Sequence, residues 1–262
     1  MTTLGLIFPP DRAPEELRHV ALAADASGVD ELWLWEDCFA ESGLAPASVV
    51  LAWTTRLRVG VGLLPVPLRN VALTAMELAT IARLFPGRLV PGVGHGVLDW
   101  MAQVGARAES PMTLLEEYTI ALRALLRGET VTTAGRYVHL DDVALAWPPS
   151  VVPPLLVGGV RPKTLTLAGA HGDGVILTGD TTVEEVRDAL GHVHRGAAGA
   201  AREVVVFVPV AGRPSAVEVV ARLDGYVAAG ATTVALLSVG DDAPPLAEFA
   251  DFVGREVRPR LG

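Results

Sequence analysis

The strongest constraint on the fold is a repeated alternation of short apolar runs with amphipathic segments of helical spacing. Such alternation is typical of strands that are each followed by a helix. The runs expected to form strands are residues 4–8, 31–35, 57–63, 88–97, 155–159, 174–177, 204–208 and 233–237. The expected helices are residues 15–27, 45–54, 71–84, 111–127, 163–170, 183–194, 216–229 and 246–257.

The strand runs are apolar at nearly every position, which is typical of strands that are buried on both faces. Regular strand–helix alternation predicts a parallel sheet. Eight units in 262 residues fit an α/β protein of the (β/α)8 TIM-barrel type, and an open doubly wound sheet is the alternative. No linker divides the chain, so we expect one domain over residues 1–262, with a small β-hairpin insertion near 130–140.

Composition narrows the class of protein. The net charge is −9 without a basic stripe, which argues against a nucleic-acid partner. No apolar run is long enough to span a bilayer, and the start of the sequence has no basic region or cleavage signal. The single cysteine, Cys38, excludes an internal disulfide. We therefore expect a soluble cytoplasmic protein that acts on a small molecule, and the six histidines form no metal-binding signature.

The fourth expected strand carries glycine at alternate positions, Gly92, Gly94 and Gly96. Because side chains alternate along a strand, this spacing strips one face of side chains. A bare face is typical of close approach by a ligand or another backbone, and a flat, ring-shaped cofactor is one candidate. A glycine-rich bend that closes the strand is the alternative.

In a barrel of this type the site lies at the C-terminal ends of the strands. Glu36 and Asp37 follow the second strand, where a carboxylate can serve as a general acid or base; a helix cap or a salt bridge is the alternative. His95 follows the fourth strand and is a candidate proton donor, or a partner for a ring carbonyl. A purely structural histidine is the alternative.

Two further strand ends have features of a binding site. Gly62 lets the backbone approach a ligand, and Arg69 is a candidate contact for an anion unless it is an ordinary surface residue. After the fifth strand, Pro162 opens a helix whose free backbone N–H groups favour an anion. Arg161 and Lys163, the only lysine of the chain, lie there, although solvated loop charges are the alternative.

Taken together, the strand-end motifs resemble the bacterial luciferase-like family of flavin- and F420-dependent oxidoreductases over almost the whole chain. The similarity is carried by residues 32–37, 55–62, 67–70, 87–96, 135–137, 156–159, 162–164 and 168–175. The resemblance implies a barrel that holds a flavin or deazaflavin ring at the strand ends, a non-proline cis bond at Gly62-Leu63, and a homodimer. It also implies cofactor contacts at Gly92, Gly94, Gly96, Val157, Gly158, Gly159, Pro162, Lys163 and Thr164.

The segment after the second strand and the Pro162-Lys163-Thr164 stretch are most similar to the F420-dependent branch. Many members of that branch carry Asp-His where this chain has Glu36-Asp37, so a histidine base is not implied there. The hypothesis is an F420-dependent oxidoreductase that transfers a hydride, with Glu36, Asp37 and His95 as acid–base candidates. The alternatives are an FMN-dependent monooxygenase of the same family and a cofactor-free barrel that acts as a binding protein.

Overall fold

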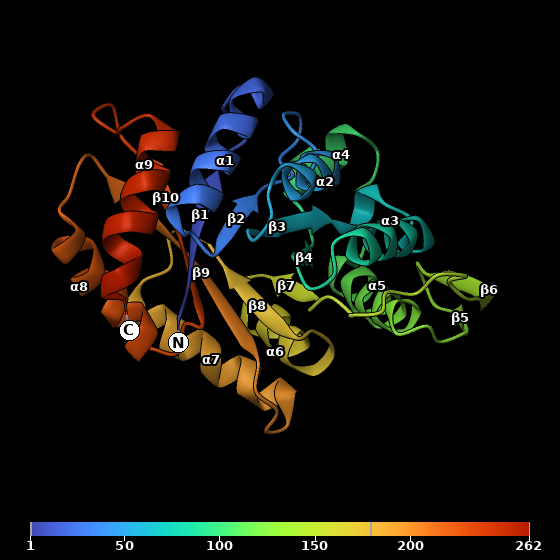
Figure 1. Cartoon of the computed structure of the whole chain (residues 1–262). Coiled ribbons are helices and arrows are strands. Elements are labelled where there is room, and N and C mark those ends of the chain that lie inside the picture. The colour runs from blue at the N-terminus through green and yellow to red at the C-terminus, as the bar shows by residue number, and fades with distance from the viewer. Residues whose placement is uncertain (1, 179, 262) are drawn as a thin grey trace.

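Eight parallel strands close into a barrel in the computed structural model, which describes residues 2–178 and 180–261 (Figure 1). Around the barrel the order is β1-β10-β9-β8-β7-β4-β3-β2. The strands are β1 Thr3–Phe8, β2 Glu31–Leu34, β3 Arg58–Pro65, β4 Leu89–Gly94, β7 Leu156–Gly158, β8 Gly174–Leu177, β9 Glu203–Ala211 and β10 Thr233–Val239. The predicted closed α/β barrel is therefore confirmed, and the open sheet is excluded.

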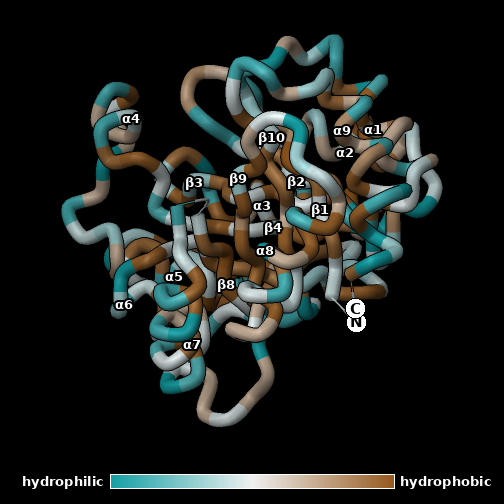
Figure 2. Tube along the Cα trace, turned by 90° about the vertical axis from the view of Figure 1, so that its left-hand side faces the viewer, coloured by the Kyte–Doolittle hydropathy of each residue, from teal (hydrophilic) through white to brown (hydrophobic). Residues whose placement is uncertain are grey.

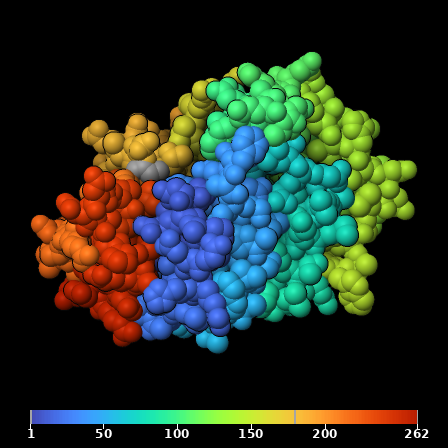
Figure 3. Space-filling view, turned by 90° about the horizontal axis from the view of Figure 1, so that it is seen from above, coloured from blue at the N-terminus to red at the C-terminus, as the bar shows by residue number. Residues whose placement is uncertain are grey.

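The first and last strands complete the ring. β1 pairs with β10 in parallel, from Thr3 opposite Thr233 to Leu6 opposite Leu236. The N-terminal and C-terminal parts of the chain consequently lie side by side, as the adjoining blue and red surfaces in Figure 3 show. Because closure leaves no unpaired strand at an edge, every strand can be buried on both sides.

Helices surround the barrel, and all except the short helix α4 contribute buried apolar residues to the layer between strands and helices (Figure 2). Thr182 with Glu185, and Ser215 with Glu218, form complete capping boxes at the starts of α7 and α8. The helices are α1 Leu17–Ser27, α2 Leu44–Trp53, α3 Val71–Leu84, α4 Leu98–Gln103, α5 Pro111–Leu126, α6 Pro162–His171, α7 Val183–Ala197, α8 Ala216–Ala228 and α9 Leu246–Phe252. None of the helices in the described ranges is both long and apolar enough to cross a membrane.

The structure departs from the prediction in two places. The short helix α4 was not predicted, because its six residues are too few to display an apolar periodicity. A π-helical turn at Val253–Val257 and a 3-10 turn at Arg258–Arg260 extend the last helix beyond α9.

A two-stranded antiparallel sheet, β5 Val131–Ala134 and β6 His139–Val143, lies outside the barrel beyond α5 (Figure 1). Its turn is held by Glu117 of α5, whose carboxylate accepts hydrogen bonds from the backbone N–H groups of Arg136, Tyr137 and Val138 at 2.8–3.1 Å. A Cβ atom at Gly135 would lie 2.5 Å from that carboxylate. The glycine is therefore needed for the carboxylate to reach the turn.

The barrel interior forms an apolar cluster of its own, separate from the layer between strands and helices. The cluster consists of Ile7, Trp33, Val90, Leu156, Ile176, Val205, Phe207 and Ala235. Trp33 is completely buried, and glycines make room for its indole ring: a Cβ at Gly5 would lie 2.9 Å from the ring, and one at Gly60 would overlap it. The ring therefore depends on two neighbouring strands having no side chain at these positions.

A buried carboxyl group closes the N-terminal end of this interior. The Trp33 indole N–H donates to Glu31 Oε2 at 2.9 Å, and Glu31 Oε1 lies 2.9 Å from Arg58 Nη1. Burial outweighs these favourable contacts and raises the pKa of Glu31 from 4.5 to about 7. Burial also raises the pKa of the neighbouring Glu203.

We predict opposite effects of alanine at two glycines. Gly60→Ala drives a methyl group into the Trp33 ring and should lower the free energy of unfolding by about 1–3 kcal/mol. Gly191→Ala, in the interior of α7 with only the end of Arg195 near its Cβ, should raise it by up to about 1 kcal/mol. Urea denaturation of the three proteins tests this. Equal stability of Gly60→Ala and the wild type would contradict the packing described for Trp33.

We predict that Glu31 makes stability fall as the pH rises from about 4.5 to about 7. In this window the unfolded chain loses the Glu31 proton while the folded protein retains it, so the stabilising effect is complete below 4.5 and is lost above 7. The slope from this group is at most roughly 1.4 kcal/mol per pH unit. Denaturation at pH 5 and pH 7.5 should show a steeper fall for the wild type than for Glu31→Gln. Parallel profiles would refute the shift.

Candidate functional site

An ion pair joins the C-terminal ends of β2 and β3. Arg69 binds Glu36 in a two-pronged manner, with Nε 3.1 Å from Oε1 and Nη2 2.7 Å from Oε2. Glu36 Oε2 also accepts the Gly43 backbone N–H at 2.6 Å, and Arg69 Nη1 lies 2.9 Å from Glu77 Oε2. The Glu36 and Arg69 side chains are only 8% and 16% exposed. The two side chains therefore form a buried ion pair, and this pair fixes the loop between β2 and α2.

This geometry bears on two predictions, which remain untested. Glu36 was a candidate acid or base, but its two carboxylate oxygens already accept from Arg69 and Gly43. Arg69 was a candidate contact for a ligand anion, but two carboxylates of the chain already neutralise it. The salt-bridge alternative is the arrangement observed.

Asp37 differs from its neighbour. It is half-buried, and burial raises the pKa of its carboxyl group. Within the described residues, its side chain makes no hydrogen bond. Of the two adjacent carboxylates, Asp37 is thus the one that is not engaged in an ion pair or hydrogen bond among the described residues. Phe39, two residues further on, is 69% exposed, and the Cys38-Phe39 bond is cis, which was not predicted.

The Gly62-Leu63 peptide bond is cis, as the family resemblance implies. The pairing of β3 with β4 shifts between Val61 and Leu64, so the bond lies in a bulge at the end of the strand. The Leu63 side chain lies over two glycines of neighbouring strands: a Cβ at Gly94 would be 2.5 Å from it, and one at Gly158 would overlap it. These glycines therefore make room for Leu63.

The open glycine face expected on β4 is not present. A Cβ at Gly92 would overlap Ile176 and lie 2.8 Å from the Val61 carbonyl oxygen. Gly96 has φ +67° and lies against Pro65 and Met101. The close neighbours of this strand are protein groups, because the barrel is narrow and its interior side chains need the space. Contacts of Gly92, Gly94 and Gly96 with a cofactor remain a prediction.

Aromatic residues line the top of the barrel interior. Phe207 stacks on Trp35 with ring centroids 5.7 Å apart, and Leu237 packs beside them. The Trp35 indole N–H is buried and has no partner among the described residues. Buried N–H groups are rarely left unpaired, yet the described residues supply no acceptor for this donor. Neither aromatic residue was predicted to belong to the site; the inward register of Trp33 and Trp35, two positions apart, is the signal that could have indicated it.

The start of α6 retains the features of an anion site. Arg161 occupies the cap position without a side-chain hydrogen bond to the helix, and Pro162 is the first helical residue. The Lys163 and Thr164 N–H groups therefore have no intrahelical acceptor. Arg161 and Lys163 are exposed beside them. Gly159 is required here, because a Cβ would overlap the Thr164 side chain.

His95 lies against this helix start. Its Nε2 is 3.3 Å from Thr164 Oγ1. Burial, reinforced by the positive charge of Arg161, lowers the pKa of His95 and so favours the neutral ring. The structure thus brings His95 together with Thr164 of the predicted anion site. Glu36 and Arg69 form a separate cluster at the ends of β2 and β3.

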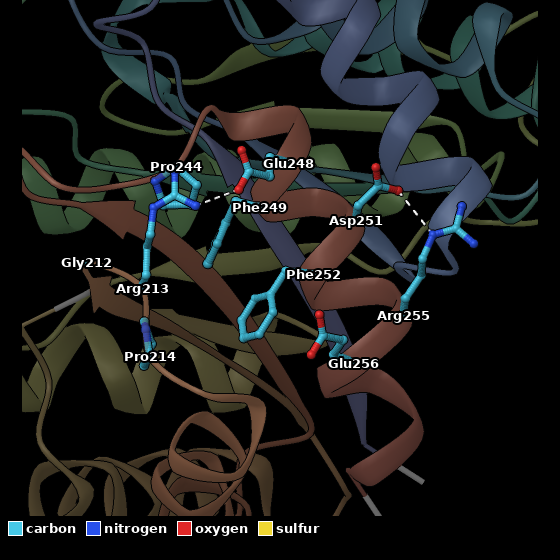
Figure 4. Close-up of a pocket in the computed structure, with 10 residues that line it drawn as sticks. All are labelled: Gly212, Arg213, Pro214, Pro244, Glu248, Phe249, Asp251, Phe252, Arg255 and Glu256. Atoms are coloured by element: carbon cyan, nitrogen blue, oxygen red, sulfur yellow. Dashed lines mark hydrogen bonds and ion pairs between the residues drawn. The ribbon is translucent and has the colours of Figure 1, made fainter.

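Two cavities adjoin loops that follow barrel strands. One, of about 280 Å³, lies between the β9–α8 loop and α9, beside the exposed ion pairs Arg213–Glu248 and Arg255–Asp251 (Figure 4). It contains none of the predicted site residues. The other, of about 370 Å³, lies between α6 and α7 and includes Pro162. No cluster of three metal-ligating side chains occurs within residues 2–178 and 180–261.

Comparison with known proteins gives one family match and several relatives. Residues 3–256 match the family described as luciferase-like monooxygenase. The chain is 34% identical over 195 residues to the F420-dependent glucose-6-phosphate dehydrogenase of Mycobacterium avium, covering 68% of this chain and 57% of that protein. It is 29% identical over 175 residues to the 5,10-methylenetetrahydromethanopterin reductase of Methanolobus tindarius, covering 67% of this chain and 53% of that protein. The matches therefore span little more than half the length of these relatives.

A solved structure shares the fold over the full chain. The coenzyme F420 dependent tetrahydromethanopterin reductase of Methanopyrus kandleri superposes with a TM-score of 0.85 at 18% identity, covering 100% of this chain and 99% of that chain. The barrel and its order of strands and helices are thus common to both proteins.

We predict that Arg69→Met destabilises the protein by about 3 kcal/mol, because it leaves Glu36 buried without its counter-charge. The matched control is Arg213→Met, which breaks the exposed pair with Glu248 and should cost less than about 1 kcal/mol. Thermal and urea unfolding measure both. If the two substitutions lowered the free energy of unfolding equally, the Glu36–Arg69 pair would not stabilise the strand ends as described.

Proposed function

This chain belongs to the luciferase-like monooxygenase family, and on that premise we propose that it is an F420-dependent oxidoreductase acting on a small organic substrate. The observation that carries the proposal is the sequence likeness to curated relatives, one of which is named for its dependence on F420. The structural support comes from two parts of a site at the C-terminal ends of the barrel strands. One part is suited to binding an anion, and the other is suited to binding a ring.

The anion end is the start of α6. A phosphate group there would meet the free N–H groups of Lys163 and Thr164, the positive end of the helix dipole, and the side chains of Arg161 and Lys163. His95, hydrogen-bonded to Thr164, would hold the Thr164 side chain in place. The residues present therefore fit a phosphate-bearing cofactor.

The ring end is formed by Leu63 on its bulge and by Trp35. Leu63 takes the space over Gly94 and Gly158, so it would provide apolar support for a ring in place of the bare backbone that we expected. The unpartnered Trp35 N–H would donate to a polar atom of the ring system or the substrate. Both features fit a flat ring with polar edges.

When bound, a deazaflavin supplies the hydride chemistry, and the protein supplies position, exclusion of water and a proton. Among the acid–base candidates, Asp37 is the one we assign to proton exchange, because burial favours its protonated form and its carboxyl group is not engaged in the Arg69 pair. Glu36 would serve by fixing the segment that carries Asp37.

The test is binding to the purified protein. Titration with F420, followed by its fluorescence, should give micromolar or tighter affinity, and FMN should bind more weakly. Preference for FMN, with oxygen uptake in the presence of reduced FMN, would favour the monooxygenase alternative. Absence of binding to either cofactor would overturn the enzyme proposal and favour a cofactor-free binding protein.

We predict that Lys163→Glu weakens F420 binding by about tenfold to a hundredfold, because it places a negative charge at the helix start. Its side chain is exposed, so thermal stability should change little. The matched control is Arg127→Glu, which makes the same change of charge on an exposed residue at the C-terminal end of α5. It should leave the affinity for F420 unchanged. Equal affinities of Lys163→Glu and the wild type would remove the phosphate assignment.

A further inference from the structure

We propose that Glu31 and Trp33 are positioning residues. From the N-terminal end of the barrel, they fix the aromatic side chains that lie beneath the Gly62-Leu63 bulge. The inference deepens the proposed function, because the bulge is part of the ring end of the site. It rests on a continuous series of contacts through the barrel interior.

The series begins at Glu31, the first residue of β2. Its Oε2 accepts the indole N–H of Trp33 at 2.9 Å, which fixes one edge of that ring. The ring meets Phe207 edge-on, with centroids 5.5 Å apart and planes at 64°. Phe207 in turn stacks on Trp35 at the strand ends. The contacts thus lead from the N-terminal end of the barrel to the site.

The bulge rests directly on this series. A Cβ at Gly62 would lie 2.8 Å from Phe207 Cζ, 3.3 Å from Trp33 Cε3 and 3.4 Å from Ile176 Cδ1. There is thus no room for a side chain between the Gly62 backbone and these three side chains, so a rotation of either ring would act on the bulge. Because Leu63 follows Gly62, its side chain would move over Gly94 and Gly158 as well.

A buried carboxylate is an expensive way to fill space at this position. Glu31 is 1% exposed, and an apolar residue of similar size would avoid the cost of removing a charge from water. An apolar residue would not, however, accept the indole N–H and so would not select one orientation of the Trp33 ring. The carboxylate oxygen of Glu31 thus fixes the orientation of the Trp33 ring. For this reason we assign Glu31 a role in the site, although it does not touch the site.

Two substitutions separate this role from general stability. Glu31→Leu and Glu31→Gln both remove the charge beside Arg58, but only glutamine retains an oxygen that accepts the indole N–H. The first readout uses the protein alone: the ¹³C-methyl NMR signals of Leu63 and Ile176. We expect Glu31→Leu to shift both signals and Glu31→Gln to leave them near their wild-type positions. If glycine-lined packing prevents Glu31→Leu from folding, Glu31→Met replaces it.

The second readout is the affinity for F420, which we expect to fall about tenfold in Glu31→Leu and less than twofold in Glu31→Gln. Glu203→Leu is the control, because it removes a carboxylate whose charge acts on the same Arg58 and which has no hydrogen bond to Trp33. Unchanged methyl signals in Glu31→Leu, or equal shifts in the leucine and glutamine variants, would overturn the proposal. Failure of the wild type to bind F420 or FMN would overturn the proposed function instead, while the methyl signals would still decide the positioning role.

Discussion

Enclosing the Trp33 indole within the barrel is the constraint on which the interior depends. A ring of that size fits only where neighbouring strands present no side chain, and Gly5 and Gly60 provide that space. Its N–H group must also find an acceptor, which Glu31 supplies. The same requirement recurs closer to the C-terminal ends of the strands. There Ile176 lies over Gly92, and Leu63 lies over Gly94. Glycines on β1, β3, β4 and β7 thus make room for bulky side chains of other strands.

The polar groups at the strand ends divide into two clusters with different chemistry. At β2 and β3, Glu36, Glu77 and Arg69 bring two carboxylates to one guanidinium, so the charges are already balanced within the protein. At α6, Arg161 and Lys163 lie exposed to solvent at the positive end of the helix dipole. The first cluster is suited to fastening loops, and the second is suited to binding an anion.

The barrel could be predicted because each strand and helix is marked locally, by apolar runs and by apolar residues at helical spacing. The cis bond at Gly62-Leu63 could be anticipated only through the family resemblance, since no local rule demands it. The partners of the site residues could not be predicted. Whether Glu36 meets a substrate or Arg69 depends on which side chains two strand ends bring together, and whether Gly92 faces a ligand or Ile176 depends on the width of the barrel.

Lysine occurs once in the chain, and its side chain extends into solvent from the first turn of α6. Apart from the α-amino group, Lys163 therefore carries the only primary amine that an acylating reagent can modify. A fluorophore coupled through that amine would be attached at one helix terminus, without engineered cysteines or mutagenesis. Acylation of Lys163 would also remove one of the positive charges at the start of α6. A label attached there would therefore change the electrostatics of the site that it reports on.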